Sequence, residues 1–299
     1  MKNNDSLDLK ATSLLILLTA LWGFNYVVIK YSNQGISPIF TSTLRSIIAS
    51  ICGLLYCYKK KEIFFHGGIM LFHGLMVGVL FGLEFACIYL GLLYTDAARS
   101  VIFVYTSPFI VAIGAHLFLR GDKLNLLKII GLIIAFTGIF VVFGGKPFSA
   151  KPTMWIGDAL EVLAAFFWGA TTIYIKRFMA EKIHPINTFL YQLVFSIPIL
   201  FCLTLILEPK WIYRFDPYIA SSLFYQSVII AFISYFLWFK LIHNYSVSRL
   251  SSFTFFTPIF GVISGILFLN EELTFSLIIG LPLVSIGIFF VNWRIPQTA

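Results

Sequence analysis

The sequence predicts an all-α integral membrane protein with ten transmembrane helices, arranged as two inverted repeats of five helices. Three observations lead to this prediction. The composition is 59% hydrophobic and only 11% charged, whereas soluble domains carry roughly 25% charged residues, so lipid is the expected solvent. Ten apolar runs are long enough to cross a bilayer. The second half of the chain also repeats the pattern of the first.

A helix of about 20 apolar residues spans the hydrocarbon core of a membrane. Runs of that kind cover residues 11–31, 37–58, 69–93, 98–119, 124–143, 156–178, 186–207, 219–240, 248–269 and 274–293. The first run continues past the length of a signal-peptide core, so we predict a first span and no cleavable signal. The fifth run contains Lys128, and the sixth begins with Asp158 and Glu161, so these two have the weakest apolar signal.

Basic residues are distributed unevenly among the connecting loops. With the N-terminus inside the cell, the inner loops carry more than twice as many Lys and Arg residues as the outer loops. This bias predicts a multi-pass protein of the inner (plasma) membrane with both termini in the cytoplasm. The net charge of +8 is therefore a topology signal, and we expect a lipid bilayer rather than nucleic acid as the partner.

The four cysteines all lie inside predicted spans, and none forms a CxxC pair; they are Cys52, Cys57, Cys87 and Cys202. Small apolar packing is the expected role of such residues. The sequence predicts no disulfide framework, no metal site and no cofactor.

A short phrase at the start of the first span returns in the sixth span. ALWGFNYVVIK (20–30) matches FFWGATTIYIK (166–176), with Trp22 opposite Trp168 at an offset of 146 residues. The match continues later, where Pro108 corresponds to Pro258. It predicts two five-helix repeats, over residues 1–147 and 153–294.

Glycines extend the repeat to the fifth and tenth spans. Gly131 matches Gly280, and Gly138 matches Gly287. Because each repeat contains an odd number of spans, the second repeat must cross the membrane in the opposite direction to the first. Inverted repeats of this kind, related by an axis in the membrane plane, are typical of secondary transporters.

These features resemble the drug/metabolite transporter superfamily, in its ten-helix EamA-type branch. The resemblance is carried by the two Trp-Gly phrases, Arg45, and the passages YTDAARSVIFVYTSP, NYSVSRLSSFTFFTP and FLNEELTFSLIIG. It implies export or exchange of small metabolites, often amino acids or related compounds. It also implies a central cavity lined by the first, third and fourth spans and by their partners, the sixth, eighth and ninth.

Glu84 and Arg45 are charged residues well inside predicted spans, where facing lipid would cost a few kcal/mol. Glu84 is near the middle of the third span, and burial there disfavours its charged form. We expect it to bind substrate or carry a coupling proton; a structural, protonated Glu is the alternative. Arg45 could pair with Glu84 or bind a carboxylate through its planar donors. A snorkelling or scaffold Arg is the alternative interpretation, which we favour slightly.

Aromatic residues with polar neighbours suggest cavity walls, since small-molecule sites are mostly apolar with a few polar groups. The candidates for substrate binding, beside Glu84, are Trp22, Asn25, Tyr26, Trp168, Thr172, Ser234 and Trp238. Ser234 corresponds to Glu84 at an offset of 150, so it is expected to face the same cavity. With 18% aromatic residues, simple packing is the alternative for each of them.

Glu161, Trp168, Thr172 and Lys176 are spaced to form one stripe on the sixth span. His73 lies eleven residues before Glu84, and an interfacial packing role is expected for it. Pro108 and Pro258 interrupt matching helices and should bend them, so we expect paired gating elements beside the cavity.

Motifs of the main alternative class, a membrane-embedded enzyme, are missing from the sequence. It contains no HExxH, GxSxG or P-loop. A secondary transporter that is not an enzyme is therefore predicted, moving a small metabolite by alternating access. Amino acid export is expected, with or without proton coupling, by a monomer or homodimer. Uptake or exchange of a nucleotide-like metabolite such as S-adenosylmethionine is the alternative.

Overall fold

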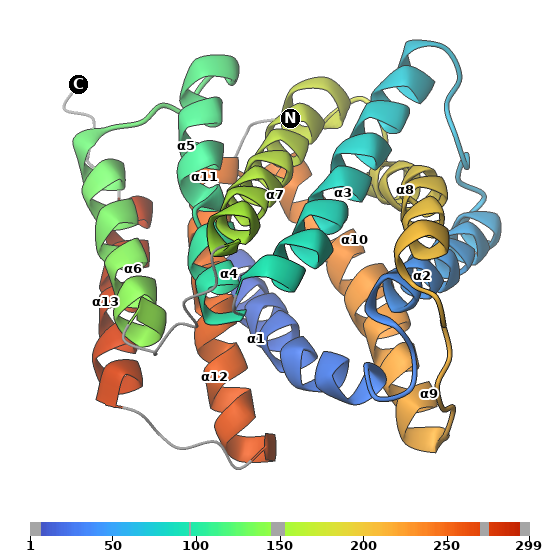
Figure 1. Ribbon diagram of the computed structural model, residues 1–299. Coiled ribbons are helices and arrows are strands. Elements are labelled where there is room, and N and C mark those ends of the chain that lie inside the picture. Colours follow the sequence, from blue (N-terminus) through green and yellow to red (C-terminus); the bar gives the residue numbers. More distant parts are fainter. Residues whose placement is uncertain (1–6, 96, 145–152, 270–274, 294–299) are drawn as a thin grey trace.

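The computed structural model describes residues 7–95, 97–144, 153–269 and 275–293, which are almost entirely helical (Figure 1). The first half contains α1 (Leu9–Ser32), α2 (Pro38–Lys60), α3 (Ile69–Tyr94), α4 (Ala97–Val104), α5 (Ser107–Phe118) and α6 (Leu126–Gly144). The second half contains α7 (Met154–Tyr174), η1 (Ile175–Met179), α8 (Pro185–Leu207), α9 (Pro217–Phe224), η2 (Tyr225–Ser234), α10 (Tyr235–Asn244), α11 (Val247–Phe253), α12 (Phe256–Leu269) and α13 (Phe275–Asn292).

Every predicted span has a helix in place. By length and composition, the described residues contain 7 helices able to cross a membrane, and three shorter apolar helices occupy the remaining spans. The predicted all-helical membrane fold is confirmed, with an isolated bridge between Ile36 and Ile212 as the β pairing in the described residues. The junction between the predicted repeats, residues 147–153, lies largely outside the described residues.

Two spans are broken at matching positions. The fourth span divides into α4 and α5, and the ninth into α11 and α12, each break falling just before Pro108 or Pro258. Proline lacks a backbone N–H and disfavours helical geometry in the residue before it, so it starts a new helix more easily than it continues one. The predicted paired bends are therefore present.

Two further irregularities were not predicted. The sixth span ends in the π-helix η1, and the eighth span contains the π-helix η2, which covers Tyr225–Ser234. A π-helical segment closes its hydrogen bonds over five residues instead of four, and such segments often occur at functional sites. In the eighth span it lies directly before Tyr235 and Trp238, which line the cavity described below.

Helices α6 and α13 lie side by side at one edge of the molecule (Figure 1). A methyl group added at Gly131 would lie 2.6 Å from the carbonyl oxygen of Gly287, and one at Gly138 would lie 2.8 Å from that of Gly280. Gly131 thus faces the repeat partner of Gly138, and Gly138 faces the repeat partner of Gly131. This exchange is what a two-fold axis between the halves requires, so it confirms their inverted relation.

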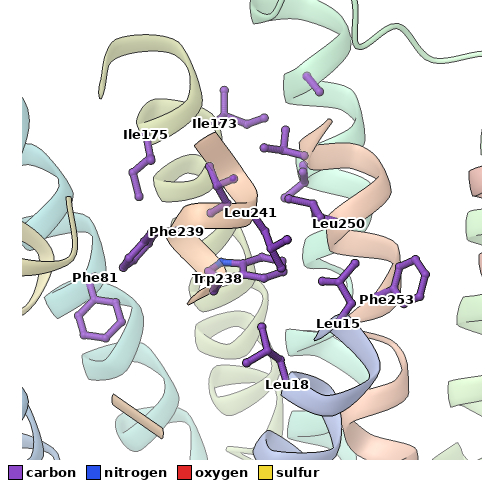
Figure 2. Packing of buried hydrophobic residues seen from close by; sticks show 14 of the residues in the cluster. Leu15, Leu18, Phe81, Ile173, Ile175, Trp238, Phe239, Leu241, Leu250 and Phe253 are labelled. Atoms are coloured by element: carbon purple, nitrogen blue, oxygen red, sulfur yellow. The ribbon is translucent and has the colours of Figure 1, made fainter. Parts of the chain in front are cut away.

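A buried hydrophobic cluster joins the two halves near their centre. Leu15 and Leu18 of α1 approach Trp238 of α10 and Leu250 and Phe253 of α11 (Figure 2). Because these side chains come from opposite repeats, the cluster holds the cavity walls of the first half against those of the second.

Candidate functional site

A cavity of about 600 Å³ lies between the two halves. It receives side chains from α1, α2, α3, α7, α8 and α10 and from the break between α4 and α5. The aromatic and polar residues lining it include Trp22, Asn25, Arg45, Phe81, Glu84, Phe85, Tyr89, Tyr105, Trp168, Thr171, Thr172, Gln192, Tyr235, Trp238 and Thr257.

Most of the predicted substrate-binding residues meet at this cavity. Those that line it are Trp22, Asn25, Glu84, Trp168, Thr172 and Trp238. Ser234 is instead fully buried behind the wall, where its hydroxyl accepts a hydrogen bond of 2.8 Å from Trp22 Nε1. The Tyr26 side chain lies outside the described residues.

Aromatic rings form two groups in the cavity lining. Trp22 packs edge-on against Trp238, with ring centroids 5.4 Å apart, and against Tyr235 at 6.5 Å. Trp168 meets Tyr105 in a similar arrangement at 5.9 Å. Edge-to-face contacts of this kind fix ring orientation, so the walls present defined faces to a ligand.

Arg45 is only 4% exposed and points into the bundle. Its guanidinium carbon lies 4.8 Å from the centroid of Phe85 and 5.7 Å from that of Tyr235, and its Nη2 donates a 3.2 Å hydrogen bond to the Tyr235 hydroxyl. The snorkelling interpretation of Arg45 is therefore wrong. Its buried Nε has no hydrogen-bond partner in the described part of the chain.

Glu84 lines the same cavity, yet the suggested ion pair with Arg45 does not form. Within the described ranges, no ion pair within 4.0 Å joins these two residues. The acid and the base thus both line the cavity without bonding to each other.

Several buried polar atoms at the cavity lack partners among the described residues. They are Asn25 Oδ1, Thr171 Oγ1, Gln192 Oε1 and Thr257 Oγ1. An unsatisfied buried polar group costs about 1–3 kcal/mol, so the cavity is suited to a polar solute or to water. Sequence analysis did not select Thr171, Gln192 or Thr257, although Gln192 matches Arg45 in the repeat, and this match was a usable signal.

Near the α1–α2 turn, the cavity lining ends at Glu208 and Ile39. The Glu208 carboxylate accepts hydrogen bonds from Ser37 Oγ at 2.6 Å, Ile39 N at 2.8 Å and Phe40 N at 2.9 Å. Glu208 directly follows α8 in the second repeat. It therefore caps the start of α2 in the first repeat. This cap joins the halves at one end of the cavity.

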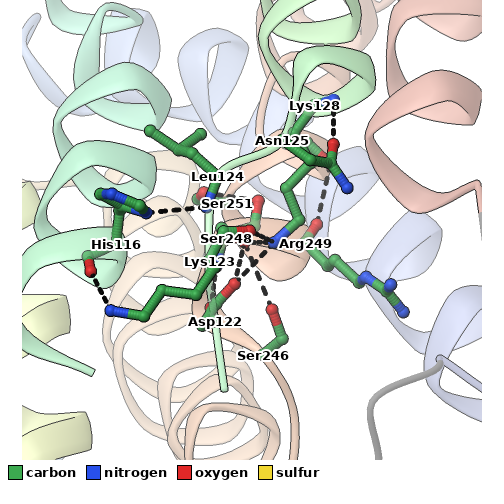
Figure 3. A network of polar contacts seen from close by, with 11 residues as sticks. His116, Asp122, Lys123, Leu124, Asn125, Lys128, Ser246, Ser248, Arg249 and Ser251 are labelled. Carbon is green, nitrogen blue, oxygen red and sulfur yellow. Dashed lines mark hydrogen bonds and ion pairs between the residues drawn. The ribbon is translucent and has the colours of Figure 1, made fainter. Parts of the chain in front are cut away.

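A polar network joins the halves at the opposite end (Figure 3). Lys128 Nζ lies 2.8 Å from Asp122 Oδ1 and 3.0 Å from Ser248 Oγ, and the Ser248 hydroxyl and amide also donate to Asp122. Burial disfavours the charged form of Asp122, but Lys128 and these hydrogen bonds outweigh it, so the pKa of Asp122 lies below its ordinary value. Lys128, the charged residue in the fifth predicted span, thus forms an ion pair with Asp122.

His73 lies away from the cavity. Its Nδ1 is 2.7 Å from the Tyr174 hydroxyl, and its ring stacks on Phe178 at 5.1 Å. Packing, as expected, accounts for it. In the described residues, no group of three or more His, Cys, Asp or Glu side chains could hold a metal ion.

Comparison with known proteins places this arrangement among transporters. The chain is 24% identical to the uncharacterized transporter YoaV of Bacillus subtilis, over 92% of this chain and 94% of that protein. It is 25% identical to a probable amino-acid metabolite efflux pump of Escherichia coli, over 94% and 95% of the two chains. One crystal structure superposes with a TM-score of 0.81 over 94% of this chain and 96% of that chain, and at 16% identity it shows the fold alone.

The profile of the EamA-like transporter family matches residues 9–144 and 155–293, which together make up most of the chain. The matched segments contain every cavity residue named above. The protein therefore belongs to the EamA-like transporter family.

Proposed function

We propose that the protein exports amino acids or closely related zwitterionic metabolites across the inner (plasma) membrane, with both termini in the cytoplasm. The observation that carries this proposal is the cavity's separate acid and base, Glu84 and Arg45, between aromatic walls. A zwitterion brings an ammonium group to the first and a carboxylate to the second. Each charged group of the ligand then exchanges its hydration water for a fixed side chain of the cavity.

The environment of each group supports this assignment. The Arg45 guanidinium lies over the rings of Phe85 and Tyr235. These contacts fix the orientation of its planar donors, which suit a carboxylate. The faces of Trp22 and Trp168 suit an ammonium group or an apolar side chain. A cavity of about 600 Å³ falls within the range of small-molecule sites. Relatives in Escherichia coli and Salmonella typhimurium are described as probable amino-acid metabolite efflux pumps.

Alternating access supplies the mechanism. The cavity lies between two inverted halves, so exchanging their conformations would move its opening from one membrane face to the other. The helix breaks at Pro108 and Pro258 are the proposed gates, since they lie at equivalent places in the two halves. Protonation of Glu84 is the proposed coupling step.

Thermal unfolding of the purified protein against amino acids, polyamines, nucleosides and S-adenosyl compounds tests the proposal. A ligand at 100 times its dissociation constant stabilises the folded state by about 2.7 kcal/mol. We expect an amino acid to stabilise the wild type and Glu181→Gln, an exposed control, but not Arg45→Gln. Stabilisation by S-adenosyl compounds alone would replace the proposal with a nucleotide-like substrate.

A further inference from the structure

A second buried carboxyl group lies outside the cavity. Glu161 of α7 is 0% exposed and lies against Gly91 of α3, where an added methyl group would be 2.7 Å from Glu161 Oε1. It lies about two helical turns along α7 from Trp168, a cavity residue. Residues of the expected polar stripe on this helix therefore have different surroundings. Trp168 lies at the cavity, and Glu161 lies at the contact between α3 and α7.

Glu161 has no hydrogen-bond partner of good geometry among the described residues, although the Ser100 hydroxyl of α4 lies close enough to favour its charged form. Asp158 lies one turn away on α7, where it accepts a 2.7 Å hydrogen bond from Thr95 Oγ1. Among the described side chains, Cys87 of α3 is also close to Glu161. An ionised, unpaired carboxylate buried here would cost several kcal/mol, so the arrangement favours the neutral acid.

Backbone atoms of α3 and α7 lie close together one turn from Glu161. A methyl group added at Gly157 of α7 would lie 2.6 Å from the backbone nitrogen of Thr95 and 2.8 Å from the carbonyl oxygen of Gly91. Ionisation of Glu161 therefore requires α3 and α7 to separate. These helices belong to opposite repeats, and their relative movement is what alternating access demands.

Glu161 is also linked to the cavity through one face of α3. Glu84, Cys87 and Gly91 are spaced by three and four residues, so they follow each other along that face. Cys87 lies close enough to interact with both Glu84 and Glu161. A movement of α3 away from Glu161 would therefore also shift Glu84 within the cavity.

We propose that Glu161 is a proton-binding site, separate from the substrate cavity, whose protonation holds α3 against α7 and whose ionisation releases them. On release, the carboxyl O–H bond breaks, the proton passes to entering water, and the carboxylate is hydrated. Closure reverses this step and takes one proton from water. The inference rests on alternating-access transport as proposed above, but its test needs no transported substrate.

The test uses Cys87 as a reporter within the full-length protein, after Cys52, Cys57 and Cys202 are changed to Ser. The rate of N-ethylmaleimide labelling is measured from mildly acidic to alkaline pH and divided by the rate in Glu161→Gln at the same pH. This ratio removes the titration of the thiol itself. Glu161→Leu is a second neutral variant, chosen because Leu15 occupies the matching position of the first repeat.

We expect the ratio to rise several-fold with pH, because ionisation opens the α3–α7 contact. Asp158→Asn, one turn away, should retain the rise, and Glu161→Leu should abolish it. A carboxylate without helix movement would repel the Cys87 thiolate and lower the ratio instead. A flat or falling ratio, or a rise that survives in Glu161→Leu, would overturn the proposal while leaving the amino acid assignment to its own ligand screen.

Discussion

Two side chains of opposite charge line the central cavity without bonding to each other. Arg45 donates to Tyr235, while Glu84 stays open to the cavity. At the scale of single residues, a mostly apolar bundle thus places an acid and a base at one cavity. A substitution that neutralises either residue therefore does not leave the other without an ion-pair partner.

Glu84→Gln should abolish transport driven by a pH gradient, because an amide of the same shape cannot take up or release a proton. Exchange of labelled for unlabelled amino acid, which needs no net proton movement, should continue. Both rates are measured in proteoliposomes, with Glu181→Gln as the control. Unchanged gradient-driven transport in Glu84→Gln would remove Glu84 from the coupling step.

Trp168→Ala should reduce transport about tenfold, because loss of one desolvated aromatic contact to a cation costs on the order of 1–2 kcal/mol. Trp293→Ala should change it little, since Trp293 is 51% exposed and lies outside the cavity lining. Initial rates of amino acid export from cells measure the difference. Equal losses in the two variants would contradict the assignment of Trp168 to the cavity wall.

At the scale of elements, the tightly packed helix pair lies at the edge of the molecule, and the interrupted helices lie beside the cavity. Helices α6 and α13 touch through glycines that leave no room for a methyl group. The breaks in the fourth and ninth spans and the π-helix η2 occur next to cavity-lining residues. A stiff pair at the edge and irregular helices at the centre suit a molecule whose halves move around a fixed contact.

Gly287→Ala should destabilise the protein by about 1–3 kcal/mol, because the added carbon would lie 2.4 Å from the backbone nitrogen of Ala135 and force the helices apart. This cost exceeds the roughly 1 kcal/mol that alanine contributes as a better helix former. Gly67→Ala is the matched control, since nothing lies within 4 Å of its added carbon. Thermal unfolding in detergent compares them, and equal stability would contradict close backbone contact between α6 and α13.

At the scale of the whole molecule, the halves are tied at both ends of the cavity. Glu208 caps α2 at one end, and the network of Asp122, Lys128 and Ser248 lies at the other. Both ties are contacts between opposite repeats. They hold the halves together at different places along the cavity.

Asp122→Asn should lower the free energy of unfolding by about 3 kcal/mol at neutral pH, because it leaves the buried Lys128 without its counter-ion. The pKa of Asp122 is lowered in the folded state, so its contribution is complete above the ordinary value of about 3.9 and is lost as the pH falls through the folded value. The unfolding free energy of the wild type should therefore drop in acid more steeply than that of the variant. Parallel pH profiles would contradict the buried ion pair.

Part of the site could be predicted from the sequence alone. Trp22, Trp168 and Glu84 are unusual inside apolar spans, which makes them candidates, and all three line the cavity. Ser234 is a candidate through its alignment with Glu84, but its hydroxyl supports Trp22 from behind. Alignment finds the level of a residue in the membrane, whereas small rotations of each helix decide which side of the wall it occupies.

The sequence by itself determined the ten spans, the inverted repeat and the two proline breaks, because these depend on local hydropathy, on duplication and on the geometry of proline. Only the tertiary structure decided that Arg45 bonds to Tyr235, that Lys128 meets Asp122, and that Glu161 lies at the α3–α7 contact. The physical reason is that the partner of a buried polar group comes from another helix. Which helix lies opposite, and at what depth, is set by the packing of both halves together.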